Sequence, residues 1–192
     1  MPNAFQERFK ASMSNLEYLS EASIEKLIAC VQERVLSKGE YLLEEGKVCK
    51  KIFFVETGFL RSFRIKEGNE MNTAFTFENN FTTNLKSLRS GTPSETSIQA
   101  AEAGVFWELD KHRLLELYRV SQEIESFGRK IVEVLSIRQE EYSNLFTLYD
   151  AKERYAYLLK NHPEIIQRVS LSQISSYLGV ARETLSRIRK QP

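Results

Sequence analysis

Hydrophobic residues occur in short, β-rich runs up to about residue 110 of this chain and recur at helical intervals after it. The earlier runs are rich in β-branched and aromatic residues and are separated by glycines at which the chain can turn. They are KIFFVE, FLRSFRI, MNTAFTFE, TSIQA and GVFWEL. Many short strands joined by turns predict a small antiparallel β-roll or jelly roll from about Arg34 to Leu109.

Helices are predicted on both sides of this region. Ser20 and Ser23 are N-cap candidates for the segment IEKLIACV, and DKHRLLELY indicates a short helix after the last strand. A long helix then begins near Ser121, and its hydrophobic side chains recur about every 3.5 residues. These side chains are Ile124, Phe127, Ile131, Val134, Leu135, Tyr142 and Leu145.

The hydrophobic face of the long helix has two interpretations. It spans about 25 residues, or ~37 Å at the helical rise, which is longer than a small roll needs to cover itself. That length favours a coiled-coil homodimer, with the second copy covering the face. The alternative is that the helix packs only on its own roll, because a stripe of this width suits either use.

The C-terminal region predicts further helices from their capping residues. Asp150 and Glu153 have capping-box spacing, and so do Ser170 and Gln173. The first helix ends at the segment NHP. The second runs for about eight residues to a turn at Gly179, and a last helix follows from about Ala181. Two short helices joined by a tight turn that contains Gly are typical of a helix-turn-helix.

The last helix has one hydrophobic and one polar face. At about 100° per residue, Ala181, Leu185 and Ile188 share the face predicted to contact the preceding helix. The other face presents Arg182, Glu183, Ser186, Arg187, Arg189 and Lys190. Arg can donate two hydrogen bonds to guanine, and Glu can accept one from the amino group of cytosine. These side chains are therefore predicted to bind DNA, the alternative being an ordinary solvated surface helix.

Charge supports a local nucleic-acid surface. The 192 residues carry a formal net charge of only +1, with 42% hydrophobic and 28% charged residues. From Pro163 onward, however, five basic residues stand against two acidic ones, a local charge of +3. The start of the chain lacks the features of a secretory signal, and no stretch approaches about 18 uninterrupted apolar residues, so we expect a cytoplasmic protein without a membrane partner.

Catalytic and metal chemistry find no support in the motifs. Cys30 and Cys49 are too few for a disulfide framework, a structural zinc site or a four-thiolate cluster, and His112 and His162 lack further ligands. No nucleophile with a plausible base, paired-carboxylate site or phosphate-cradling glycine loop is present. We therefore expect no enzyme, no metal and no cofactor.

The element order resembles the CRP/FNR family of bacterial transcription factors: a roll of the cyclic-nucleotide-binding type, a long dimerisation helix and a helix-turn-helix. The most specific match is the family's G-x-x-R-E-T-x-x-R run, which corresponds to Gly179, Arg182, Glu183, Thr184 and Arg187. The resemblance implies an α+β fold with three parts. These are a roll domain with N-terminal helices (1–120), the dimerisation helix (121–148) and a DNA-binding domain (149–192).

Two departures from the family pattern change what the resemblance implies. The residues up to Pro192 leave no room for the usual β-hairpin wing, so fewer DNA-backbone contacts are expected. In cyclic-AMP-binding relatives, a G-E pair binds the ribose and an R-S or R-T pair binds the phosphate. Here Thr83 and Asn84 align with the first pair, and Ser94 and Glu95 with the second. Glu95 would repel an anion, so a degenerate pocket that does not bind cyclic AMP is expected.

The resemblance therefore implies a sequence-specific, homodimeric regulator of transcription. Its expected partners are a palindromic double-stranded DNA site, a second copy of the chain, RNA polymerase and an unidentified small-molecule effector. The alternative function is a ligand-sensing or protein-interaction module that no longer reads DNA.

Overall fold

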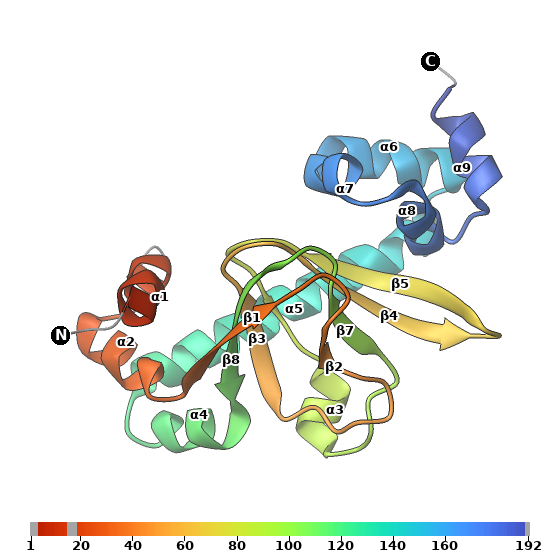
Figure 1. The fold of residues 1–192 in the computed structure, drawn as a ribbon. Coiled ribbons are helices and arrows are strands. Elements are labelled where there is room, and N and C mark those ends of the chain that lie inside the picture. The colour runs from red at the N-terminus through yellow and green to blue at the C-terminus, as the bar shows by residue number, and fades with distance from the viewer. Residues whose placement is uncertain (1–3, 15–18, 191–192) are drawn as a thin grey trace. The chain divides into compact units, whose positions relative to one another are not determined.

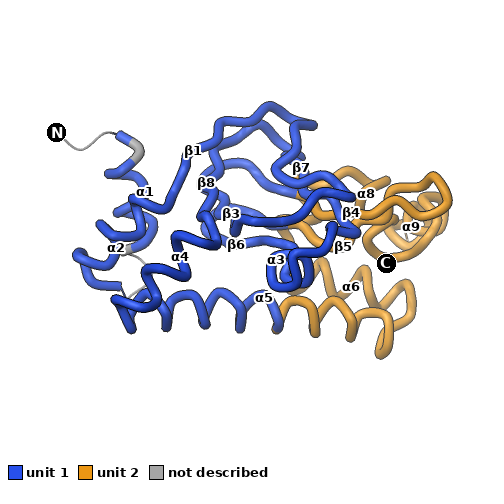
Figure 2. Tube along the Cα trace, turned by 90° about the horizontal axis from the view of Figure 1, so that it is seen from below, with its two compact units in different colours: residues 1–60, 76–136 blue, residues 61–75, 137–192 orange. Residues whose placement is uncertain are grey.

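The computed structural model describes residues 4–14 and 19–190. The chain divides into two compact units (Figure 2). Unit 1 comprises residues 1–60 and 76–136, and unit 2 comprises residues 61–75 and 137–192. The predicted boundaries at residues 120 and 148 differ from this division, because a β-hairpin from the first region and the end of the long helix both belong to the compact unit of the C-terminal helices.

The β-rich region forms an antiparallel jelly roll of two four-stranded sheets (Figure 1). The first sheet has the order β1-β8-β3-β6, with β1 (Val31–Leu36), β8 (Gly104–Asp110), β3 (Lys51–Val55) and β6 (Phe81–Thr82). The second has the order β2-β7-β4-β5, with β2 (Tyr41–Leu43), β7 (Ser97–Ala100), β4 (Leu60–Lys66) and β5 (Asn69–Thr76). Each of the five predicted runs contains a strand, which confirms the predicted fold class.

Side-chain alternation in β8 separates two hydrophobic cores. Phe106 faces the interior of the roll, where it packs with Phe53 and Val55. Trp107 and Leu109 face the helices instead. Trp107 is fully buried, and its ring stacks on that of Phe54 with 4.9 Å between centroids. The first sheet is thus buried on both faces, as a strand with consecutive hydrophobic residues requires.

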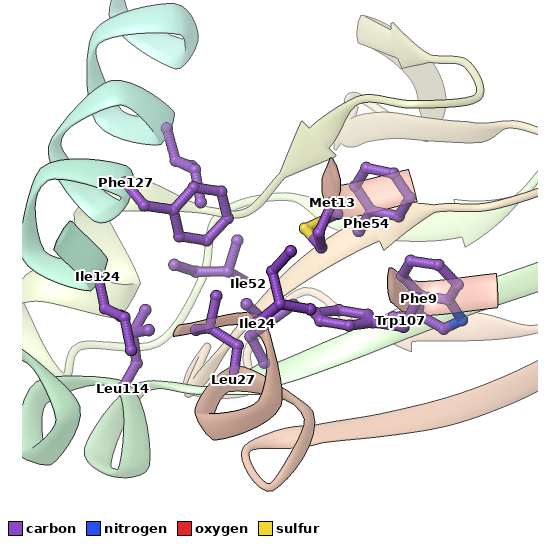
Figure 3. Close-up of a cluster of buried hydrophobic side chains, with 12 residues drawn as sticks. Phe9, Met13, Ile24, Leu27, Ile52, Phe54, Trp107, Leu114, Ile124 and Phe127 are labelled. Carbon is purple, nitrogen blue, oxygen red and sulfur yellow. The ribbon is translucent and has the colours of Figure 1, made fainter. Parts of the chain in front are cut away.

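The outer core of unit 1 is built by helices from both ends of the roll. They are α1 (Ala4–Ser14), α2 (Glu21–Ile28), α4 (Lys111–Tyr118) and the first part of α5 (Gln122–Leu148). Figure 3 shows the side chains of Ile124 and Phe127 of α5 pointing toward Leu27 and Ile52, in the same hydrophobic cluster. Side-chain caps at Ser20 and Asp110 hold the starts of α2 and α4, and the Ser20 cap confirms one of the two candidates.

A glycine inside α5 has a packing role. In the interior of a helix, Gly lowers stability relative to Ala. At Gly128, a Cβ atom would lie 1.6 Å from the phenol oxygen of Tyr118. The absence of a side chain therefore lets α4 and α5 approach each other.

Unit 2 contains the predicted helix-turn-helix. Its helices after α5 are α6 (Ala151–Asn161), α7 (Pro163–Arg168), α8 (Leu171–Leu178) and α9 (Arg182–Ile188). Both predicted capping boxes are present, at Asp150 with Glu153 and at Ser170 with Gln173. Helix α7 was not predicted from the sequence; it begins at Pro163, where a missing N–H costs nothing.

No helix among the described residues is long and apolar enough to cross a membrane. Within the same residues, no group of three or more His, Cys, Asp or Glu side chains is arranged to hold a metal ion.

Candidate nucleic-acid interface and roll cavity

The turn between α8 and α9 depends on a left-handed residue. Gly179 has φ +66°, which L-residues with a side chain adopt only at a cost. The Val180 N–H donates to the carbonyl of Ser175 at 3.0 Å, closing the end of α8. Arg154 of α6 adds a second link, because its guanidinium donates to the Leu178 carbonyl at 2.7 Å. The direction of α9 is therefore set by backbone geometry and by a neighbouring helix.

Helix α9 packs against α6 and α8 through one face. Leu185 is fully buried and Ile188 is half-buried, whereas Ala181 is exposed at the helix start and supplies no side-chain cap. Of the predicted DNA-binding residues, Ser186 is half-buried and the others are exposed. The exposed ones are Arg182, Glu183, Arg187, Arg189 and Lys190. No described residue forms an ion pair with them, so their charges are available to a partner.

The predicted effector residues lie together around α3 (Leu85–Ser90) in unit 1 and are hydrogen-bonded to one another or to the backbone. Asn84 caps α3 by accepting from Ser87 N–H, and its amide donates to the hydroxyls of Ser94 and Thr96 at 2.9 Å. Ser94 is 3% exposed, and its hydroxyl donates to the Thr96 carbonyl at 2.7 Å. These groups already have partners.

The remaining two predicted effector residues are also engaged. The Thr83 hydroxyl donates to the Lys51 carbonyl at 2.8 Å. Glu95 forms an ion pair with Lys86, and both side chains are largely exposed. These four residues, here called the cassette, therefore supply no cation to a cyclic phosphate, which is the charge that such a ligand needs.

A cavity of about 310 Å³ opens elsewhere on the roll, between β1, β2, β3 and β8. Glu108 lies in its wall, is 3% exposed, and pairs with Lys51 and with Arg34. Lys47 and Lys50 add two further cations to the lining, and Glu44 adds one further carboxylate. The volume lies at the lower end for small-molecule sites, and the basic lining suits an anion.

Most of the predicted dimer residues of α5 lie inside the protomer. Ile124, Phe127 and Ile131 belong to the outer core of unit 1, and Leu135 packs at its edge. Val134 is 45% exposed. In unit 2, Leu145 is buried and Tyr142 is half-buried. The periodicity located the helix and its buried face, whereas other hydrophobic residues of α5 are exposed.

Ser176 of α8 was not singled out from the sequence. Its hydroxyl contacts the backbone of β5, about 100 residues away in the chain, within unit 2. A serine in the middle of a short helix carries no local pattern that indicates such a contact.

Comparisons with known proteins agree with this arrangement. Residues 33–121 match the model of the cyclic nucleotide-binding domain. The chain is 30% identical to the transcriptional activator protein Anr of Pseudomonas aeruginosa over 173 aligned residues, covering 81% of this chain and 68% of Anr. A second Anr, from Pseudomonas protegens, has the same identity and coverage.

Solved structures show the same fold at lower identity. FixK2 from Bradyrhizobium japonicum superposes with a TM-score of 0.70 at 21% identity, covering 84% of this chain and 83% of FixK2. The c-di-GMP responsive regulator CLP from Xanthomonas campestris superposes with a TM-score of 0.71 at 18% identity, covering 89% of this chain and 90% of CLP.

Proposed function

Because this chain belongs to the CRP/FNR family of transcriptional regulators, we propose that it reads a palindromic DNA site as a homodimer, with α9 as the recognition helix. The observation that carries the proposal is the polar face of α9. Its cations and one carboxylate are exposed, while Leu185 fixes the opposite face against α6 and α8. As a regulator of transcription, the bound dimer is proposed to have RNA polymerase as a further partner.

The side chains of α9 divide into two proposed roles. Arg182, Glu183 and Arg187 contact base edges, the arginines at guanine and the glutamate at cytosine. Ser186, Arg189 and Lys190 contact the DNA backbone and hold the register. A glutamate among phosphates is repelled unless a base amino group compensates, so Glu183 supports base reading over nonspecific binding.

Dimerisation supplies the sequence specificity that a single helix-turn-helix lacks. A single helix-turn-helix contacts few base pairs, whereas two heads about 34 Å apart read two half-sites on one face of the duplex. The proposed contact uses the exposed hydrophobic residues of α5. Ile137 follows Val134 by three residues and Leu148 follows it by fourteen, which is heptad spacing. These three side chains are 45%, 49% and 64% exposed for Val134, Ile137 and Leu148 respectively.

The DNA-reading proposal is tested by selection from a random duplex library at two salt concentrations, without added effector. We expect recovery of a palindrome with G·C-bearing half-sites about one helical turn apart. Binding should weaken steeply with salt because cations contact phosphates. Retention without any sequence preference contradicts the proposal.

The dimer is tested by sedimentation velocity of the double variant Val134→Glu/Ile137→Glu. We expect a shift from dimer to monomer, because two carboxylates replace the hydrophobic contact in each copy. Val132→Glu is the matched control: Val132 is 46% exposed but lies on a different side of α5. A monomeric wild-type protein, or a double variant that stays dimeric, contradicts this interface.

The cavity on the roll favours a second candidate function, a ligand-sensing module that does not read DNA. Its lining carries four cations and two carboxylates, an excess of positive charge that suits a small anionic effector, whereas the self-bonded cassette does not favour cyclic AMP. The two functions separate in one measurement. If Arg182→Ala and Glu183→Ala change the sequence preference, α9 reads DNA; if the wild-type protein shows no sequence preference for these variants to change, the ligand-sensing function stands alone.

A further inference from the structure

The β4–β5 hairpin belongs to the same compact unit as the helix-turn-helix (Figure 2). Strand β5 is the last strand of its sheet, so one edge of its backbone has no neighbouring strand in the described part of the chain. At this edge, the Ser176 hydroxyl of α8 donates to the Glu70 carbonyl at 2.7 Å. The same oxygen accepts from the Asn72 N–H at 3.0 Å. One hydroxyl thus bonds two backbone groups of the edge strand.

Aromatic packing surrounds this pair of hydrogen bonds. The ring of Tyr177 lies 5.3 Å from that of Phe75 and 5.0 Å from that of Tyr142, centroid to centroid. The Tyr142 hydroxyl, from the end of α5, donates to the Asn72 carbonyl at 3.4 Å. Burial raises the pKa of both tyrosines, so their phenols stay neutral. Asn72 itself is 2% exposed, so water cannot readily replace these contacts.

The hairpin that receives Ser176 is braced within itself. Arg61 forms an ion pair with Glu70 across the two strands, and its guanidinium lies 4.0 Å from the centroid of the Phe63 ring. The Thr73 hydroxyl donates to the Ser62 carbonyl at 3.2 Å. A braced hairpin is a firmer support than a flexible loop, because its backbone positions move together.

The chain passes from α5 to the following helices through Tyr149 and Asp150, where the helical backbone is interrupted, and the Arg154 guanidinium of α6 lies 4.7 Å from the centroid of the Phe146 ring of α5. The bonds of Ser176 to β5 attach these helices to the hairpin as well, and a further attachment restricts their rotation. The contact leaves the reading face open, since Arg182, Glu183 and Arg187 stay exposed while Ser176 is bonded to the hairpin. Its effect is therefore on direction and does not cover the DNA-binding residues.

We propose that Ser176 is a positioning residue for DNA reading. By bonding α8 to the edge of β5, it fixes the direction in which α9 projects and so sets the half-site spacing that the dimer accepts. The inference rests on the proposed function. A residue with this role changes how affinity depends on spacing and leaves the contacts of α9 with one half-site unchanged.

The test measures binding to palindromes whose half-sites are separated by increasing numbers of base pairs. Wild-type protein is expected to prefer one spacing strongly. Ser176→Ala leaves the Glu70 carbonyl and the Asn72 N–H without their partner, and we expect about tenfold weaker binding at the preferred spacing. At neighbouring spacings the variant should approach the wild type, so that its spacing preference flattens. Binding to a duplex with a single half-site should stay within about twofold of wild type.

Two variants and one spectroscopic readout complete the experiment. Ser176→Thr retains the hydroxyl and should restore the spacing preference, while Ser143→Ala removes an exposed serine hydroxyl of the same unit and should match the wild type. Amide hydrogen exchange at Asn72 reports directly on the contact and should accelerate only in Ser176→Ala.

The inference is overturned if Asn72 exchanges faster in Ser176→Ala while the spacing preference stays that of the wild type. Equal weakening at one half-site and at the palindrome also overturns it, because the defect then lies in α9 itself. If wild-type protein binds no palindrome at all, the proposed function fails and the inference fails with it. If the wild-type protein binds a palindrome and Ser176→Ala binds it with the same spacing preference, the inference fails while the proposed function stands.

Discussion

The polar side chains around α3 already form hydrogen bonds within the protein, whereas the charged side chains of α9 are exposed to solvent. Both sets occupy ligand-binding positions of the CRP/FNR family, although the residues around α3 were expected to form a degenerate pocket that does not bind cyclic AMP. Around α3, Asn84 and Ser94 donate and accept within the cassette. On α9, Arg182 and Arg187 are exposed and have no ion-pair partner among the described residues.

This contrast teaches that residue type alone does not make a binding site. A hydrogen-bonding group that is already satisfied must give up its partner before it can bind a ligand, and the exchange yields little net free energy. Exposed groups exchange only water. The four predictions below test the contrast, beginning with the largest expected effect.

Ser94→Arg introduces the residue type that binds the cyclic phosphate in relatives. Because Ser94 is 3% exposed and bonded to Thr96, we expect the variant to lose at least about 2 kcal/mol of unfolding free energy through a buried, unpaired charge. It should not gain cyclic AMP binding. Urea unfolding with and without millimolar cyclic AMP measures both.

The matched control for that variant is Ser90→Arg, at an exposed position at the end of α3. Its free energy of unfolding should stay within about 0.5 kcal/mol of the wild-type value. A stable Ser94→Arg protein whose unfolding shifts with cyclic AMP would show that the cassette opens for a ligand.

Arg182→Ala and Arg187→Ala should each weaken binding to the selected palindrome by about 1 to 3 kcal/mol per half-site and relax the base preference at one position. The cause is the loss of a bidentate contact to guanine. Fluorescence anisotropy with single-base variants of the site measures the change. Arg189→Ala should instead weaken binding to all sequences alike and reduce the salt dependence of binding. If the three variants behave identically, the assignment of Arg182 and Arg187 to base contacts is wrong.

Gly179→Ala should destabilise unit 2 by about 1 to 2 kcal/mol, because a Cβ atom disfavours the left-handed backbone. The Cβ would also lie 3.0 Å from Cε1 of Phe146. Thermal unfolding measures the loss. Gly179→Asn should cost less, since Asn tolerates this conformation, and equal losses in the two variants would assign the effect to crowding.

Ala181→Ser should be the smallest change and a favourable one. Helix α9 begins at Ala181 without a side-chain cap, whereas Asn84 caps α3. A serine hydroxyl can accept from the free N–H groups of the first turn and should stabilise α9 by about 0.5 to 1 kcal/mol. Amide exchange in α9 measures this gain. Ala181→Val cannot accept and should show none; a gain in both would point to packing.

The extent to which the sequence predicted the fold follows from how local each signal is. The runs KIFFVE and GVFWEL lie in strands β3 and β8, and the capping boxes at Asp150 and Ser170 begin α6 and α8. Strands β1, β2 and β6 and helices α3 and α7 were not predicted. They are at most six residues long, so periodicity has too few positions to register them.

The candidate site was predicted unevenly for the same reason. Arg182, Glu183 and Arg187 followed from helical spacing, and the structure places them on one exposed surface. The contact of Ser176 with β5 joins segments about 100 residues apart, and no pattern in either segment indicates it. The cavity around Glu108 likewise combines four strands.

By itself, the sequence determined most of the elements of this protein and the polar face of α9, because caps, glycine turns and hydrophobic spacing act over a few residues. Only the tertiary structure decided what covers each face. Ile124, Phe127 and Ile131 pack in their own protomer, and the donors of Asn84 bond within the cassette. A periodic hydrophobic stripe has the same sequence whether it packs inside the protomer or stays exposed, and a polar pair has the same sequence whether it is bonded internally or free to bind a ligand. Which of these occurs depends on the distant segment that packs against it.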